Sequence, residues 1–250
     1  MNLWRLEILR LLRTRFWLAL FTPFLVFGLL GPVMAYYLSD ILSSASTNIT
    51  IIVAEAQPMD GFSNYINNAF QIGLLVAIII GASALAIDTN PSLSIFYRSR
   101  AGLNPARLIL PRYGIVSLAT ILAFDLGILA CWYQTNILLG SVEWQDILIG
   151  TLLINLYLGY SLSVLSLSTT LVKSTKASVG ISLIILLSMP ILGMIKQVSD
   201  WLPSSLVGSL VSIASDKSTP SDYYPASLVA IVLIPILLWT SVTLFKKRSI

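Results

Sequence analysis

The sequence predicts an all-α integral membrane protein that crosses the bilayer six times. Three observations support this fold class: the composition, the length of the uncharged stretches and the placement of the basic residues. Of the 250 residues, 56% are hydrophobic and 10% are charged, whereas soluble domains carry about 25% charged residues. So few charged side chains cannot cover a water-facing surface. The composition therefore excludes a soluble enzyme, a nucleic-acid-binding domain and a disordered chain.

Six stretches are long enough to cross a bilayer, because about 20 mostly apolar residues span its ~30 Å hydrocarbon core. Five of them contain no Asp, Glu, Lys or Arg, and the sixth contains the single carboxylate of Asp125. The long unbroken runs argue against a β-barrel, whose strands alternate in hydrophobicity over short segments. The predicted helices cover residues 16–38, 69–87, 113–135, 147–170, 177–195 and 226–244.

The basic residues predict the orientation of these helices. When the N-terminus is placed inside, 13 of the 15 basic residues fall on the cytoplasmic side, and the other two are Lys196 and Lys217. This asymmetry follows the positive-inside rule. We therefore expect a multi-pass protein of the plasma (inner) membrane with both termini in the cytoplasm.

Residues 2–15 have the pattern of a basic amphipathic helix before the first span. Its apolar stripe at helical spacing consists of Trp4, Ile8, Leu11 and Leu12. Its polar face consists of Glu7, Arg10, Arg13 and Thr14. This pattern favours an interfacial helix with its arginines near anionic lipid. The alternative is a charged flank that only sets the topology.

The cytoplasmic loop between the second and third spans contains two predicted helix starts. Asn90 and Asn104 each precede a proline, which is the order of an N-cap and a first helical residue. The first start predicts a short helix over residues 91–100, and the second leads into the third span. The short helix carries Leu93, Phe96, Tyr97, Arg98 and Arg100.

Aromatic and arginine side chains of this kind favour docking to a partner protein, because Tyr, Phe and Arg are enriched in interface cores. The alternative is that Phe96 and Tyr97 rest in the membrane interface while the arginines only set the topology. Both interpretations keep the loop on the cytoplasmic side.

We expect the outer segment between the fifth and sixth spans, residues 196–224, to form a re-entrant or interfacial helix pair. Its uncharged part, residues 201–215, is too short to cross the bilayer. A seventh span would place the basic C-terminal residues outside, against the charge distribution. The sequence thus predicts one transmembrane domain over residues 1–250, with no nucleotide-binding domain in this chain.

The motifs of common catalytic sites are missing from the sequence. The chain has no His and one Cys, Cys131, which excludes His-based triads, His-containing metal sites and an internal disulfide. The patterns GxxxxGK[ST], HExxH and GxSxG are also missing. We therefore expect no catalytic residue, no metal site and no cofactor in this chain.

Asp125 is the one ionisable residue well inside a predicted span. It lies roughly 18 Å above the cytoplasmic boundary at 1.5 Å per residue, where a charge costs about 2.5–3.5 kcal/mol on insertion scales. Asn155 in the fourth span reaches a comparable depth, and Asn155 and neighbouring tyrosines are the candidate partners. Two interpretations follow for Asp125: a place on a substrate path or subunit interface, or a neutral hydrogen-bonded carboxyl inside the bundle.

The layout resembles the type-2 membrane subunits of ABC exporters over nearly the whole chain. The most specific local match is the loop after the second span, which contains an acidic residue, a short helix and then a stretch with small residues, Pro and Arg. Here these are Asp88, PSLSIFYRSR and AGLNPAR. The loop departs from the family pattern at Asp88 and at Asn90–Pro91, where Glu and Gly-Thr are commoner.

This resemblance implies a permease subunit that binds no nucleotide itself and pairs with a second permease, identical or homologous. Residues 91–100 would be the coupling helix that docks on a separate P-loop ATPase subunit, which binds ATP and Mg. Closure of the ATPases would open a path for a hydrophobic drug-, peptide- or lipid-like substrate. Asp125, Asn155 and Trp201 would lie on that path or at the subunit interface, with residues 201–215 capping its outer end.

Two other functions are compatible with the residues. One is a non-transporting membrane immunity or scaffold protein, and the other is an intramembrane lipid-modifying enzyme. The enzyme would need paired polar groups at one depth, and the spans offer little beyond Asp125 and Asn155. Among these functions, only the permease requires P-loop ATPase subunits as partners.

Overall fold

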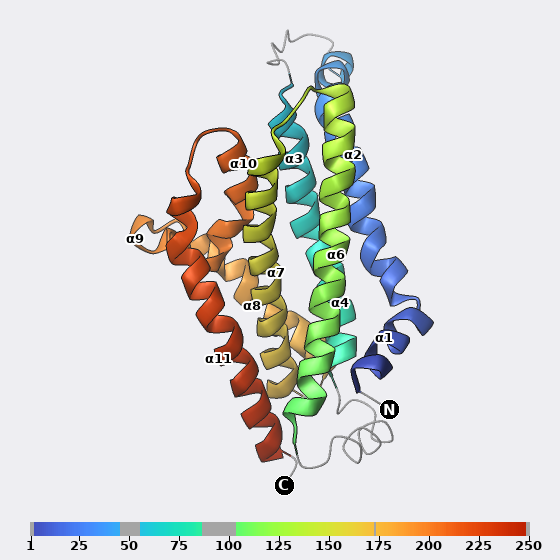
Figure 1. The fold of residues 1–250 in the computed structure, drawn as a ribbon, viewed down its shortest axis with the longest axis vertical. Helices are drawn as coiled ribbons and strands as arrows, with labels where there is room; N and C mark the ends of the chain where they lie inside the picture. The colour runs from blue at the N-terminus through green and yellow to red at the C-terminus, as the bar shows by residue number, and fades with distance from the viewer. Residues whose placement is uncertain (1–2, 46–55, 87–103, 173, 249–250) are drawn as a thin grey trace.

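The computed structural model describes residues 3–45, 56–86, 104–172 and 174–248, which form an elongated bundle of helices (Figure 1). No strand occurs in these ranges. They contain six helices that are long and apolar enough to cross a membrane. The all-α class and the six candidate spans are therefore confirmed. The predicted coupling helix at residues 91–100 lies outside the described residues.

The six candidate spans differ from the predicted ranges mainly at their ends. They comprise α2 (Phe16–Ala45), α3 (Pro58–Asn68) continued through the π-helical turn η1 (Ala69–Gly73) into α4 (Leu74–Leu85), α6 (Ala106–Leu138), α7 (Trp144–Leu171), α8 (Thr175–Leu192) and α11 (Tyr224–Arg248).

Two spans begin earlier than predicted because polar residues cap their first turns. The second span begins at Pro58 rather than 69, where the backbone N–H of Gln57 donates to the Asp60 carboxylate at 2.8 Å. The third begins at Ala106 rather than 113, and the Asn104 side chain accepts from the Ala106 N–H at 3.0 Å. Such bonds satisfy backbone donors that have no partner at a helix start. The helix start predicted at Asn104 is thus present, shifted by one residue.

The helices α2 and α6 approach each other most closely at two glycines. A Cβ added to Gly28 would collide with the backbone of Gly127, and one added to Gly127 would meet the carbonyl oxygen of Phe24 at 2.7 Å. Small residues at such crossings allow helix backbones to come close together. The Tyr65 hydroxyl donates to the Phe124 carbonyl oxygen at 2.9 Å, which ties α3 to α6.

The helix α7 lies among the other spans, and α8 and α11 flank it (Figure 1). Its C-terminal half is rich in buried serines whose hydroxyls donate to carbonyls one turn earlier, as at Ser161, Ser163 and Ser168. This satisfies polar atoms that would otherwise be left unpaired in an apolar surrounding. By contrast, α8 and α11 leave many large apolar side chains exposed.

The outer segment between the fifth and sixth spans folds into short helices. These are α9 (Lys196–Ser199), η3 (Pro203–Gly208), α10 (Ser209–Ala214) and η4 (Pro220–Tyr223). The backbone of Leu210 packs directly on Gly150 of α7, and the Ser209 hydroxyl donates to the Leu206 carbonyl oxygen at 2.7 Å. The segment is therefore helical and docked on the bundle, while its re-entry into a membrane stays a prediction.

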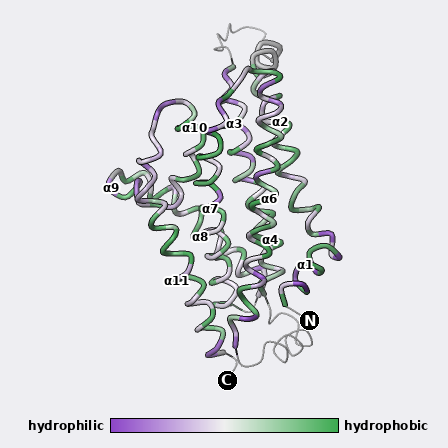
Figure 2. Tube along the Cα trace, viewed as in Figure 1, coloured by the Kyte–Doolittle hydropathy of each residue, from purple (hydrophilic) through white to green (hydrophobic). Residues whose placement is uncertain are grey.

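The first helix, α1 (Leu3–Arg13), lies beside the lower ends of α2 and α6, at the same end of the bundle as the end of α11 (Figure 1). Its apolar residues Trp4, Ile8 and Leu12 are exposed, whereas Glu7 is buried. The helix thus turns its carboxylate inward and three of its four stripe residues outward, while Leu11 packs against the core; exposed apolar residues of this kind suit an interfacial helix. Hydrophilic residues gather mostly at the ends of the bundle and in the loop after α10 (Figure 2).

Candidate functional site

The candidate site residues named from the sequence fall into three groups. Asp125 and Asn155 lie together between α6 and α7. Trp201 lies apart from them, between α9 and η3; its side chain is 56% exposed and does not line the pocket that Asp125 and Asn155 form. The five docking residues lie outside the described residues. They are Leu93, Phe96, Tyr97, Arg98 and Arg100.

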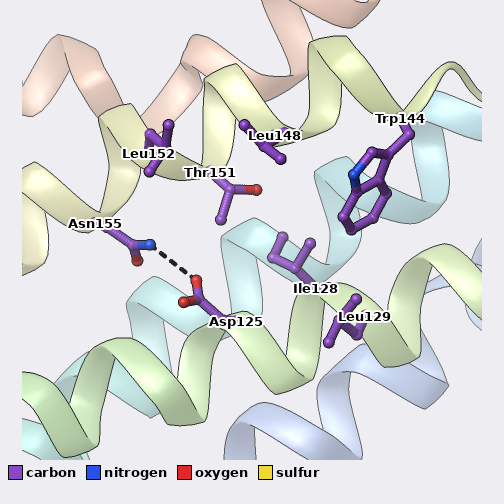
Figure 3. A pocket seen from close by; sticks show the side chains of 8 residues that line it. All are labelled: Asp125, Ile128, Leu129, Trp144, Leu148, Thr151, Leu152 and Asn155. Atoms are coloured by element: carbon purple, nitrogen blue, oxygen red, sulfur yellow. Dashed lines mark hydrogen bonds between the residues drawn. The ribbon is translucent and has the colours of Figure 1, made fainter.

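Asp125 and Asn155 meet because α6 and α7 run in opposite directions. Asn155 lies about 16 Å along α7 from Trp144, and Asp125 lies about 20 Å before the end of α6 at Leu138. At that depth the Asn155 amide donates to Asp125 Oδ1 at 2.9 Å (Figure 3). The partner predicted from the comparison of depths is therefore present.

The two side chains form the polar end of a pocket of about 270 Å³ between the C-terminal half of α6 and the N-terminal half of α7. Trp144 lies at the opposite end from Asn155 (Figure 3). Apolar walls with a few polar groups are typical of small-molecule sites, whose volumes run from about 300 Å³ upward. The lining residues are Asp125, Ile128, Leu129, Trp144, Leu148, Thr151, Leu152 and Asn155.

Asp125 and Thr151 present hydrogen-bond acceptors to this pocket. Among the described residues, none forms an ion pair with Asp125, and Asn155 is its one hydrogen-bond donor. The Thr151 hydroxyl gives its hydrogen to the Ile147 carbonyl oxygen at 2.7 Å. Its oxygen therefore keeps only its acceptor capacity. A ligand that donates hydrogen bonds would complement these groups.

A second polar cluster, at the end of the bundle where α1 lies, joins three helices. Arg112 Nε of α6 binds Glu7 Oε1 of α1 at 2.9 Å, and Arg10 Nη1 binds Glu7 Oε2 at 3.1 Å. Both arginines also donate to the carbonyl oxygen of Ala84, in the last turn of α4, at 3.2 Å. Glu7 and Arg112 are 5% and 3% exposed. We call these four residues the Glu7 cluster.

The Glu7 cluster joins the two helices that flank residues 87–103 in the sequence. Ala84 lies just before the segment, and Arg112 lies in the second turn of α6 after it. The carbonyl groups at a helix C-terminus lack intrahelical partners and attract cations, so two guanidinium groups suit Ala84. The chain thus anchors α4 and α6 to each other and to α1 at this point.

Sequence reasoning missed the Glu7 cluster. It placed Glu7 and Arg10 on one polar face and counted Arg112 as a topology charge. The available signal was that Glu7 is the one acidic residue among four arginines in the first 15 positions. Its main partner is 105 residues away in the sequence, and this distance hid the pairing.

In the part of the chain that the structure describes, no group of three or more Cys, Asp or Glu side chains could hold a metal ion. Comparison of the chain with protein-family models, curated proteins and solved structures finds no match. The similarity to ABC exporter permeases therefore remains an inference from the residues and the layout.

Proposed function

We propose that this chain is the permease subunit of an ATP-driven ABC exporter. With a second permease, identical or homologous, it would form the path for a hydrophobic drug-, peptide- or lipid-like substrate. Separate P-loop ATPase subunits would bind ATP and Mg and dock on residues 91–100. The observation that carries this proposal is the Glu7 cluster, which joins the helices before and after residues 87–103.

A permease that is driven by a separate ATPase needs a rigid connection between the docking segment and its spans. If the ends of that segment were loosely held, a displacement of the segment would be absorbed locally. Here α4, α6 and α1 share one buried ion cluster, and removing one partner of a buried ion pair typically costs about 3–5 kcal/mol. A push on the segment would therefore move these three helices together.

The exposed apolar faces of α8 and α11 support the second part of the proposal. Ile184, Leu187 and Ile191 lie on one side of α8, and each is at least two-thirds exposed in the single chain. Large exposed apolar surfaces mark sites that contact lipid or another protein. A second permease and the surrounding lipid would together cover these faces.

Co-purification tests the docking part of this proposal. The tagged chain is extracted from its native membranes, and the proteins bound to it are identified by mass spectrometry. We expect a P-loop ATPase to bind the wild type and to be lost from the double variant Phe96→Ala/Tyr97→Ala. A matched control is Tyr36→Ala/Tyr37→Ala, which removes two exposed aromatic residues near the other end of the bundle.

A second measurement separates docking from coupling. Glu7→Gln is expected to keep the ATPase bound while lowering substrate-stimulated ATP hydrolysis, because it loosens the connection and leaves the docking residues unchanged. If no P-loop ATPase binds the wild type, the chain is not such a permease. In that case turnover of lipid by the purified chain would favour the intramembrane enzyme, and tight ligand binding without turnover would favour the immunity or scaffold protein.

A further inference from the structure

The pocket between α6 and α7 contains a carboxylate for which the described residues provide no cation. Asp125 accepts one hydrogen bond, from the neutral Asn155. A carboxylate at membrane depth is costly unless it meets a cation, water or hydrogen-bond donors. Asn155 also fixes the orientation of the carboxyl group, because its amide binds Oδ1 and leaves Oδ2 for another donor.

We propose that this pocket binds the ammonium group of a small amphiphilic primary amine. This goes beyond the proposed function, since it assigns a ligand to a site that one chain forms alone. An ammonium group has three N–H donors, which can bind Asp125 Oδ2 and the Thr151 hydroxyl oxygen. Charge-assisted bonds of this kind are about twice as strong as neutral ones.

The charge of Asp125 disfavours ligands with an anionic or an uncharged head group. A carboxylate or phosphate ligand would face the negative charge of Asp125, and the lining residues include no Lys or Arg to offset the repulsion. An alcohol can donate one hydrogen bond, but it lacks the charge that complements Asp125. The pocket therefore selects ligands first by the charge of their head group and second by its number of hydrogen-bond donors.

The apolar part of the ligand has a defined place. Ile128, Leu129 and Leu148 lie between the polar end and Trp144 (Figure 3). Leu148 is 44% exposed and Leu152 is 60% exposed, so the pocket opens on the apolar flank of the bundle. An alkyl chain would lie along this wall and extend past the rim, and the ligand would enter from the membrane.

The depth of the site restricts the source of the amine. Asn155 lies about 16 Å below Trp144 along α7, and tryptophans favour the membrane interface. The amine of a phospholipid head group lies at that interface and does not reach Asp125. The ligand is therefore a small or single-chain amine and not an intact aminophospholipid.

Equilibrium binding of radiolabelled n-decylamine to the full chain in phosphatidylcholine nanodiscs tests this inference. Empty nanodiscs correct for partitioning into lipid. We expect saturable binding to one site per chain, weaker binding of n-decanol, and no saturable binding of decanoate. Asp125→Asn should weaken decylamine binding by about tenfold or more, the usual effect of losing a charged hydrogen-bond partner.

Three controls keep the result interpretable. Asp146→Asn removes a carboxylate from the first turn of α7 without touching the pocket lining, and it should bind like the wild type. Leu152→Trp leaves Asp125 intact but narrows the rim, and it should block the amine. Both variants, and Asp125→Asn, are compared with the wild type by thermal unfolding, so that loss of binding is distinguished from loss of the fold.

Three results would overturn the inference: equal decylamine affinity in the wild type and Asp125→Asn, decanol binding as tight as decylamine binding, or competition by phosphatidylethanolamine added to the nanodiscs. Because the isolated chain is used, these results do not depend on an ATPase. Failure of ATPase co-purification would remove the proposed function and leave the amine site, and failure of amine binding would do the reverse.

Discussion

At the scale of single residues, the Glu7 cluster shows how this chain uses its few charges. Glu7 forms an ion pair with each of two arginines, and Ala84 supplies the carbonyl oxygen that both arginines also bind. Buried charges are tolerated only when they are paired and hydrogen-bonded. The fold therefore depends on the complete set, and each member should be sensitive to replacement.

We predict that Glu7→Gln lowers the free energy of unfolding by about 3–5 kcal/mol, because it leaves Arg112 buried without its carboxylate. Arg13→Gln changes an exposed charge on the same helix, and surface changes of this kind usually stay within about 0.5 kcal/mol. Unfolding of both variants in detergent, followed by circular dichroism, gives the comparison.

A double variant shows whether the pair itself carries the effect. In Glu7→Gln/Arg112→Met both members of the ion pair are replaced, so the loss should be smaller than the sum of the two single losses. Strictly additive losses would mean that the two side chains contribute to stability independently. The ion pair would then not couple α1 to α6.

At the scale of helices, the contact between α2 and α6 depends on the absence of side chains at Gly28 and Gly127. We predict that Gly28→Ala destabilises the protein by about 1–3 kcal/mol, as overpacking of a close contact does. Gly180→Ala in α8 is the matched control, because its Cβ would meet nothing within 4 Å. Alanine there should be neutral or stabilising, since it favours helix more than glycine does.

Thermal unfolding of the two alanine variants in one detergent measures this difference. A Gly28→Ala variant as stable as Gly180→Ala would show that α2 shifts away from α6 at little cost. The close approach would then be a detail of packing without energetic weight.

The same helices show what the sequence could and could not predict. Uncharged runs located all six spans, because the bilayer sets their minimum length. They misplaced the starts at Pro58 and Ala106, because capped polar turns extend a helix beyond its uncharged run. The contact between Asp125 and Asn155 was predictable from depth alone, since both lie in neighbouring antiparallel spans.

The rest of the pocket was not predictable in this way. Trp144, Leu148, Thr151 and Asn155 recur at helical spacing on α7, but their register against α6 depends on how the two helices pack. The Glu7 cluster depends on contacts across more than 100 residues. Such contacts arise from the whole bundle, and local patterns contain no information on them.

At the scale of the whole molecule, the two ends of the bundle differ in charge and in structure. One end holds α1, the Glu7 cluster and the end of α11, and the other holds the tops of α2 and α3 (Figure 1). The basic residues predict that the first end faces the cytoplasm. The proposed function requires this orientation, because ATP and the ATPase subunits are cytoplasmic.

Cysteine labelling in intact cells tests the orientation. The native Cys131 is buried and is replaced by Ala, and single cysteines are introduced at Thr14 and Ser221, which are exposed and uncharged. We expect an impermeant maleimide to label Ser221→Cys in intact cells and Thr14→Cys only after permeabilisation, because the basic residues keep α1 inside. Neither substitution alters the charge distribution, so the labelling reports the native orientation.

The opposite labelling pattern would place the Glu7 cluster and the 87–103 segment outside, where no ATPase could act on them. The pocket would then open towards the inner leaflet, and the amine site would survive as a binding site that meets ligands from the cytoplasmic side.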